Sequence, residues 1–302
     1  MDSVRADIAL RLQESIVQLN QRGLFHASVW CSEQLLGITR YGGKEEDIGD
    51  HEPDIQSTSA DSDTVLSSEE RRLIAFATSL LSLADYARCA FLFRKNSKLR
   101  RNLSSTSIFI ACYSLYLAGE KLKDQLDSEA VHTPNSLSAP EEQAQPRKLP
   151  SRGSPSNPYL QDLFIELLPY YETPAEATAD GYLLYLFALI VRDIRSSQSP
   201  LSSSLSQKIH TLPPTEEIFL QAVLETPYNW SAWLDLSSYC SENQLPLPPL
   251  LIHLLSSKSS VSSSSSSPSC IFESSSSARI MFQCFLVHHF LALFKPQQCL
   301  PV

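Results

Sequence analysis

The glycines of this 302-residue chain are too few and too widely spaced to build the loops on which many enzyme folds depend. There are eight glycines, and none lies two residues from another, so G-x-G-x-x-G does not occur, and G-x-S-x-G does not occur either. Extended runs of alternating apolar and polar residues, bounded by glycine-containing turns, are also hard to find. We therefore expect an all-α fold, and a hydrophobic content of 43% is enough to supply a substantial core.

The net charge of the chain limits the kinds of partner that it can bind, and its cysteines and apolar segments indicate its cellular compartment. A formal net charge of −9 argues against a nucleic-acid partner, because phosphate binding needs concentrated Lys and Arg. The N-terminus lacks a signal-peptide pattern and the apolar stretch Tyr182–Val191 is too short to span a bilayer, so we expect a soluble intracellular protein. The cysteines form an odd set without a C-x-x-C pair, typical of reduced core thiols: Cys31, Cys89, Cys112, Cys240, Cys270, Cys284 and Cys299.

Apolar residues recur every three to four positions in pairs of segments, which is the pattern of helical hairpins. Residues 1–41 contain two such segments separated by Gly23, and a turn that short makes the two helices antiparallel. The first segment carries one apolar stripe, formed by Val4, Ile8, Leu12, Ile16 and Leu19. We interpret residues 1–41 as the first hairpin.

Two further blocks show the same pattern. In residues 67–127, Ser67 is the expected cap of a helix, Asp85-Tyr86 marks a turn, and a third helix covers Ser105–Leu126. In residues 158–255 we expect helices at Leu160–Tyr171, Glu176–Arg195, Pro213–Leu224 and Asn229–Tyr239, with Asn229 as a cap. Residues 278–302 are expected to form a terminal helix, Arg279–Phe294, and a tail.

Four stretches lack the composition that a packed core requires. Residues 42–66 form an acidic flexible linker, and residues 128–157 form a disordered insertion rich in proline and serine. A serine-rich break lies near residues 196–213, and residues 256–277 are low-complexity sequence made mostly of serine. We expect these stretches to interrupt the helical blocks.

The hairpins share short sequence features. Gly23-Leu24-Phe25-His26-Ala27-Ser28 and Asp85-Tyr86-Ala87-Arg88-Cys89-Ala90 each place an aromatic residue at the turn, with small residues three to four positions later. Hairpins of roughly 34 residues stacked in series are typical of tetratricopeptide arrays, in which each repeat buries its face against its neighbours. The predicted architecture is a degenerate tetratricopeptide-like α-solenoid of tandem antiparallel hairpins.

Longer strings connect the chain to a known family. They are Leu19-Asn-Gln-Arg-Gly-Leu-Phe25, Glu33-Gln-Leu-Leu36, Tyr113-Ser-Leu-Tyr-Leu-Ala-Gly-Glu-Lys121, Asp180-Gly-Tyr-Leu-Leu-Tyr-Leu186 and Asn229-Trp-Ser-Ala-Trp-Leu234. In this order they resemble the N-terminal region of the eighth-subunit family of the anaphase-promoting complex, a cell-cycle ubiquitin ligase. Such relatives would continue through more repeats after Pro296–Val302, so we expect a truncated or mis-spliced product.

The resemblance implies a non-catalytic scaffold that acts in the nucleus and cytoplasm through protein–protein contacts. Its N-terminal helices would pair with a second copy of the chain, and other surfaces would contact other subunits of the ligase. It implies no cofactor, nucleic acid, membrane or small-molecule substrate.

Two alternatives stay open. A tetratricopeptide co-chaperone or adaptor would hold a C-terminal carboxylate with Lys and Asn on inner helices. Arg5 is followed four residues on by Ala9 rather than Asn, whereas Lys98 and Asn102 have the required spacing. An enzyme assembled from residues far apart in sequence is the other alternative.

No residue pattern supplies a catalytic, cofactor-binding or metal site. The segment Gly37–Lys44 has one residue too many for the phosphate loop G-x-x-x-x-G-K-[ST] and is followed by Glu45, so we interpret it as a helix end and linker. His288-His289 near Cys284 gives poor tetrahedral spacing, with no second cluster to complete four ligands. Ser, His and Asp are present without a nucleophile elbow to assemble them.

Three other groups of residues each have a structural and a functional interpretation. We interpret Trp30, Trp230 and Trp233 as helix packing rather than a ligand cage. The basic run Arg94, Lys95, Lys98, Arg100 and Arg101 is interpreted as a solvated helix C-terminus rather than an import signal or nucleic-acid patch, with a contact to the acidic segment 44–70 as an intermediate hypothesis. Minimal sites for proline-directed kinases are expected by chance in such linkers: Thr133-Pro134, Ser154-Pro155, Ser199-Pro200 and Ser267-Pro268.

Overall fold

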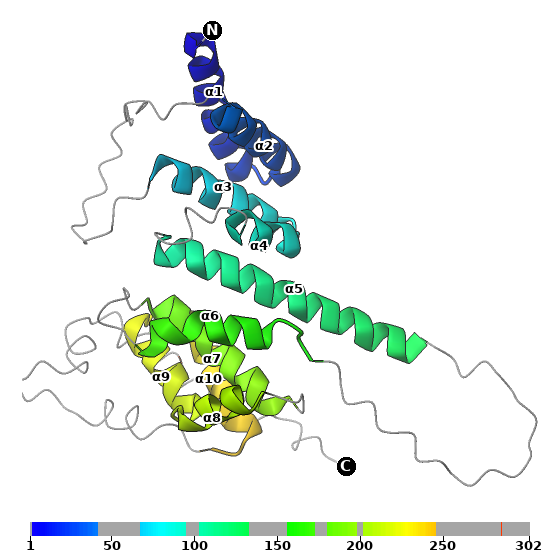
Figure 1. Ribbon diagram of the computed structural model, residues 1–302, viewed down its shortest axis with the longest axis vertical. Coiled ribbons are helices and arrows are strands. Elements are labelled where there is room, and N and C mark those ends of the chain that lie inside the picture. The colour runs from blue at the N-terminus through cyan, green and yellow to red at the C-terminus, as the bar shows by residue number, and fades with distance from the viewer. Residues whose placement is uncertain are drawn as a thin grey trace, which may run out of the picture. The chain divides into compact units, whose positions relative to one another are not determined.

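The computed structural model describes residues 2–41, 67–94, 103–132, 156–172, 180–197, 202–245 and 285. Within these residues the helices are α-helices and no strand occurs, which confirms the all-α prediction. The chain divides into two compact units, Met1–Leu122 and Lys123–Val302. The ribbon in Figure 1 shows the helices of each unit.

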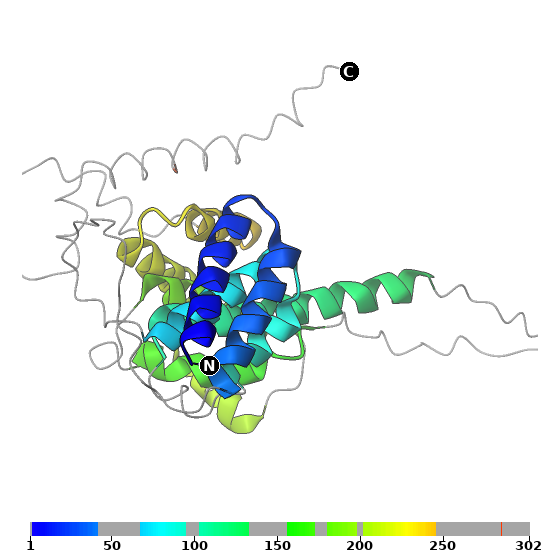
Figure 2. The same ribbon diagram turned by 90° about the horizontal axis from the view of Figure 1, so that it is seen from above.

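The first unit is a row of helices, each packed against the next. It contains α1 (Asp2–Gln21), α2 (Phe25–Tyr41), α3 (Ser68–Ser82), α4 (Tyr86–Arg94) and the first part of α5 (Ser105–His132). α1 packs against α2, α2 against α3, and α3 against α4, and α1 and α2 lie side by side in Figure 2. This serial stacking of antiparallel pairs confirms the tetratricopeptide-like solenoid that the sequence predicted.

Apolar side chains hold this row together in two clusters. Ile16 of α1 packs with Cys31 and Leu35 of α2. The larger cluster joins four helices, through Val29 and Leu36 of α2, Leu73, Phe76, Ala77 and Leu80 of α3, Cys89 and Phe93 of α4, and Ile110 of α5. Each helix therefore buries its apolar face against neighbours in the row, as in repeat proteins.

Three helices end with the same backbone motif. Gly23 after α1, Ala84 after α3 and Gln244 after α10 (Trp230–Glu242) have φ values of 72°, 55° and 54°. The next residue in each case donates its N–H to the carbonyl five residues earlier, at 2.9, 3.0 and 2.8 Å: Leu24 to Leu19, Asp85 to Leu80, and Leu245 to Cys240. Such left-handed endings satisfy free carbonyls at a helix C-terminus and turn the chain sharply. In the first two cases the turn leads directly into the second helix of a hairpin.

The second unit is built around one almost entirely buried helix. α7 (Gly181–Ser196) packs against α6 (Leu160–Glu172) and α9 (Thr215–Glu225), and α9 packs against α10. Ten of the sixteen residues of α7 are buried, which fits its nearly continuous apolar sequence. Gly181 makes this packing possible, because a Cβ atom there would lie 2.7 Å from Cγ2 of Thr226.

Two predictions about element boundaries require correction. α5 continues to His132, beyond the predicted end at Leu126 and into the stretch predicted to be disordered. Residues 127–132 contain no glycine or proline, and Pro134 is the first residue that opposes a helix. The predicted serine-rich break near 196–213 contains a helix, α8 (Ser203–Thr211), whose Leu205 and Ile209 lie four residues apart and are buried.

Capping residues explain other boundaries. Ser67 caps α3 as predicted, because its hydroxyl accepts the N–H of Glu70 at 3.2 Å. α7 begins at Gly181 rather than Glu176, with Asp180 accepting the N–H of Tyr182 at 3.0 Å. Asn229 occupies the predicted cap position of α10 but forms no side-chain cap bond.

Several predictions lie outside the described residues. They are the acidic linker 42–66, the insertion 128–157 from residue 133 to residue 155, the serine tract 256–277, and the terminal helix and tail apart from Phe285. Phe285 is helical and fully buried, and its ring lies 4.6 Å from that of Trp233, measured between centroids.

Candidate interaction surface

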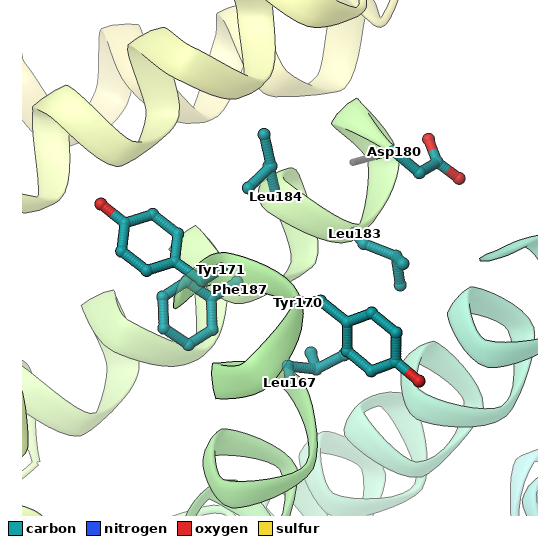
Figure 3. Close-up of a pocket in the computed structure, with 7 residues that line it drawn as sticks. All are labelled: Leu167, Tyr170, Tyr171, Asp180, Leu183, Leu184 and Phe187. Atoms are coloured by element: carbon teal, nitrogen blue, oxygen red, sulfur yellow. The ribbon is translucent and has the colours of Figure 1, made fainter. Parts of the chain in front are cut away.

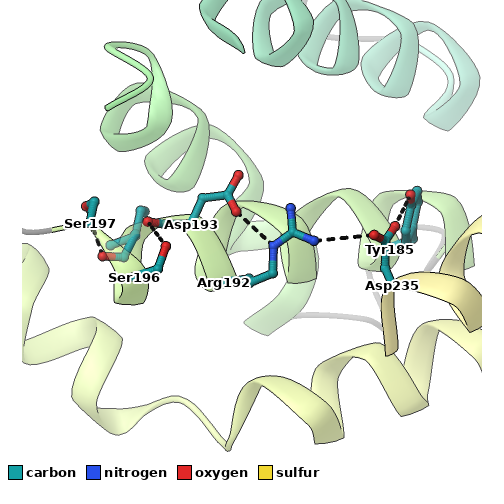
Figure 4. Close-up of polar contacts among 7 residues, drawn as sticks. Tyr185, Arg192, Asp193, Ser196, Ser197 and Asp235 are labelled. Carbon is teal, nitrogen blue, oxygen red and sulfur yellow. Dashed lines mark hydrogen bonds and ion pairs between the residues drawn. The ribbon is translucent and has the colours of Figure 1, made fainter. Parts of the chain in front are cut away.

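A polar cluster on α7 and α10 contains residue types that enzymes use, but its geometry is that of a helix–helix tie. The Tyr185 hydroxyl donates to Asp235 at 2.7 Å, and the Arg192 guanidinium donates to the same carboxylate at 3.3 Å and to Asp193 at 2.8 Å (Figure 4). The carboxylate of Asp235 is thus shared by a phenol and an arginine from the neighbouring helix. The Asp235 carboxylate, which could otherwise serve as a base, is therefore already occupied by strong hydrogen-bond donors. The cluster helps to fix the packing of α7 against α10.

The pocket drawn in Figure 3 lies between α6 and α7. It holds only about 10 Å³, space for one water molecule, whereas small-molecule sites are typically several hundred Å³. Its lining is mostly apolar, formed by Leu167, Tyr170, Tyr171, Asp180, Leu183, Leu184 and Phe187. Asp180 already caps α7, and burial raises the pKa of Tyr171, so its phenol is neutral at ordinary pH.

The described cysteines are poor nucleophiles. Cys31, Cys89, Cys112 and Cys240 are reduced and buried, which confirms the prediction of core thiols for these four. Burial raises the pKa of Cys89 to about 11, and burial likewise raises the pKa of Cys240 to about 11. The hydroxyl of Ser114 donates to the Cys89 sulfur at 3.0 Å, which partly offsets the rise. Cys270, Cys284 and Cys299 lie outside the described residues.

Other predicted positions fall in different parts of the molecule. Gly37 lies inside α2, which runs on to Tyr41, so the helix ends later than at that glycine. Arg5 and Ala9 lie on α1, whereas Lys98 and Asn102 are outside the described residues, as are His288 and His289. In the described part of the chain, no three His, Cys, Asp or Glu side chains are grouped as metal ligands, and none of its helices is long and apolar enough to cross a membrane.

The three tryptophans do not share one role. Trp233 is fully buried and its indole N–H donates to the Pro227 carbonyl at 2.8 Å, which confirms the packing interpretation for this residue. Trp230 is partly buried. Trp30 is 59% exposed on α2, so the packing interpretation is wrong for Trp30 within the described chain. An exposed tryptophan is more typical of an interaction surface.

The first hairpin carries a high density of exposed apolar side chains. Val4 and Ile8 continue the stripe of Leu12 and Ile16 along α1, yet Val4 is 60% and Ile8 43% exposed. The other large exposed side chains on this hairpin and its turn are Leu10, Val17, Leu24 and Trp30. Val4 and Ile8 lie one helical turn apart on the same face of α1, so they form an exposed apolar pair that a partner can cover.

A second pair of exposed aromatic residues recurs in two successive hairpins. Trp30 and Phe91 each lie seven residues after the left-handed turn residue of their hairpin, Gly23 or Ala84, and both are exposed. Three residues before Phe91, Arg88 of α4 forms an ion pair with Glu33 of α2, and the Arg88 guanidinium lies 5.8 Å from the ring centroid of Phe76. Trp30 and Phe91 thus occupy equivalent positions in successive hairpins. Sequence reasoning missed Phe91, which alignment on the turn residues identifies.

Comparisons with known proteins show similarity to one protein family. A family model described as anaphase promoting complex subunit 8 / Cdc23 matches residues 7–300. The chain is 26% identical over 252 residues to anaphase-promoting complex subunit 8 of Arabidopsis thaliana, covering 78% of this chain and 38% of that protein. It is 24% identical over 226 residues to cell division cycle protein 23 homolog of Homo sapiens, covering 74% and 29%. The chain therefore spans less than half the length of these relatives.

Proposed function

Since the chain belongs to the anaphase promoting complex subunit 8 / Cdc23 family, we propose that it acts as a non-catalytic scaffold subunit of that cell-cycle ubiquitin ligase. Its proposed partners are other subunits of the complex, in the nucleus and cytoplasm of dividing cells. The observation that carries the proposal is a row of stacked helices whose outer faces expose apolar side chains. Surfaces of this kind bind polypeptides, and stacked repeats commonly provide them.

The N-terminal hairpin is the proposed site of self-association. The outer half of the α1 stripe, Val4 and Ile8, stands exposed although it continues a buried pattern. Covering such side chains stabilises an assembly by roughly 25 cal/mol for each Å² of apolar surface removed from water. A second copy presents the same stripe, so two copies can cover each other across a two-fold axis.

Light scattering at micromolar concentration tests the proposed homodimer. The wild-type chain has a mass of 33.7 kDa and is expected to show twice that mass as a dimer. An obligate dimer buries more than about 2,000 Å², so it should persist at micromolar concentration. Ile8→Glu places a charge in the apolar stripe and is expected to give a monomer. Gln13→Glu, at an exposed polar position of the same helix, adds the same charge and should leave the dimer intact. A folded wild-type monomer, or a dimer insensitive to Ile8→Glu, would refute self-association through α1.

A further inference from the structure

A buried carboxylate ties the start of α5 to α3 within the first unit. Glu70 lies in the first turn of α3 and is 5% exposed. Its Oε1 accepts the backbone N–H of Ser104 at 2.8 Å, the Ser104 hydroxyl at 2.7 Å and the Ser107 hydroxyl at 2.6 Å. Among the described residues Glu70 forms no ion pair with a lysine or arginine, so the serine donors stabilise its charge.

Ser104 is the residue on which this tie depends. It directly precedes Ser105, the first residue of α5, and its carbonyl accepts the N–H of Ile108 at 3.0 Å. Its hydroxyl also accepts the N–H of Ser107 at 3.3 Å, as a helix cap does. Ser104 is only partly buried, and the end of a helix opens more readily than its middle. The hydroxyl can therefore become accessible without unfolding of the whole unit.

The sequence before Ser104 contains arginines at the spacing that some protein kinases recognise. Arg101 lies three residues before Ser104 and Arg100 lies four before it, and Ser97 is the one other serine with an arginine three residues earlier. Arginine at this distance is the feature by which arginine-directed protein kinases select serines. The structure adds that the Ser104 hydroxyl is hydrogen-bonded to a buried carboxylate.

We propose that Ser104 is a phosphorylation site for an arginine-directed protein kinase, and that the phosphate releases the start of α5 from α3. In the reaction, Oγ of Ser104 forms a bond to the γ-phosphorus of ATP. The bond from that phosphorus to the β,γ-bridging oxygen breaks, ADP leaves, and the hydroxyl proton is released to solvent.

The phosphate on Ser104 can take two orientations, and each disrupts the hydrogen bonds between Glu70 and the start of α5. If it stays at the start of α5, where the helix dipole favours an anion, it competes with Glu70 for the same donors and carries nearly two negative charges beside that carboxylate. If it turns toward solvent, Glu70 loses the Ser104 hydroxyl and remains buried with fewer donors. Both outcomes weaken the contact between α3 and α5. Phosphorylation of Ser104 would therefore loosen the row of helices at the contact between α3 and the start of α5.

The test uses the full chain, incubated with ATP and the catalytic subunit of an arginine-directed kinase, in a Ser97→Ala background. Tandem mass spectrometry is expected to locate a phosphate on Ser104, and Ser104→Ala should remove it. Hydrogen exchange of the amides at the start of α5 and in the first turn of α3 should become about tenfold faster or more after phosphorylation. No phosphate on Ser104, or a phosphate without faster exchange there, would overturn the proposal.

Two variants separate the charge effect from general damage. Ser104→Asp is expected to accelerate exchange in the same amides, whereas Thr106→Asp, on an exposed position of the same helical turn, should not. Glu70→Gln keeps an oxygen acceptor but removes the negative charge, so phosphorylation should accelerate exchange less in this variant than in the wild type. Equal acceleration in both proteins, or equal effects of the two Asp variants, would contradict repulsion by Glu70.

Discussion

Gly37 and Gly181 both lie in helices, yet a methyl group added to each should have opposite effects on stability. At Gly37 a Cβ atom would meet no other atom within 4 Å, so Gly37→Ala should stabilise the protein by about 0.5–1 kcal/mol through higher helix propensity. At Gly181 a Cβ atom would overlap Thr226, whose hydroxyl donates to the Ala222 carbonyl at 2.9 Å. Gly181→Ala should therefore cost about 1–3 kcal/mol.

Urea unfolding of the two alanine variants measures this difference directly. The variants serve as controls for each other, because each makes the same chemical change at a helical glycine. A Gly181→Ala protein as stable as the wild type would show that α7 and α9 are not as close as described.

The buried thiols predict how stability depends on alkaline pH. The ordinary thiol pKa of 9.0 is raised to about 11 in Cys89 and Cys240, so above pH 9 the unfolded chain loses thiol protons that the folded chain keeps. The stability that these residues contribute is fully present below pH 9 and is lost as the pH rises toward 11. Replacing Cys89 and Cys240 with Ala should flatten this decline.

Urea unfolding between pH 8 and 11 checks this prediction, in a variant with Cys270, Cys284 and Cys299 changed to serine. In the same variant, a thiol reagent at pH 8 should label the folded protein far more slowly than the unfolded protein. Rapid labelling of Cys89 or Cys240 in the folded protein would contradict the burial described here.

Among the elements, α8 depends on one arginine of α7. The Arg195 guanidinium donates to the Thr215 hydroxyl at 2.8 Å and to the carbonyls of Ile209, Leu212 and Pro213 at 3.1, 3.3 and 3.0 Å. Arg195→Met keeps most of the side-chain stem but removes every donor, and should cost about 1–3 kcal/mol. Limited proteolysis should then cut near α8 faster, whereas Lys208→Ala, at an exposed position of α8, should leave the cutting rate unchanged. Unchanged cutting in Arg195→Met would rule out this role.

Sequence patterns predicted the helices better than they predicted the boundaries. The Ser67 cap and the turns at Gly23 and Asp85-Tyr86 were predictable, because local chemistry determines them. α8 was missed because serine composition concealed two apolar residues whose burial depends on packing and on Arg195 from another helix. No pattern suggested the Glu70 tie, since its partners lie more than thirty residues further along the chain.

The exposed surface was the least predictable part of the candidate site. Val4, Ile8 and Trp30 belong to sequence patterns that normally indicate burial, and only the packing of neighbouring helices determines that they are exposed. Helical periodicity identifies an apolar face but not the partner that covers it.

The first unit consists of repeated helical pairs, and we expect their outer faces to serve protein contacts. The shared left-handed turns after α1 and α3, and the equivalent positions of Trp30 and Phe91, show the repeat in the backbone and on the surface. Because each repeat contacts mainly its neighbours, such a row leaves long exposed faces. These faces, rather than the small pocket between α6 and α7, are where we expect partners to bind.

Affinity purification of the full-length tagged chain from dividing cells, with quantitative mass spectrometry of the proteins that remain bound, tests the scaffold role most directly. We predict that other subunits of the anaphase promoting complex are recovered in fixed proportion to the chain. Recovery of a folded chain without any of those subunits would contradict the proposed scaffold role.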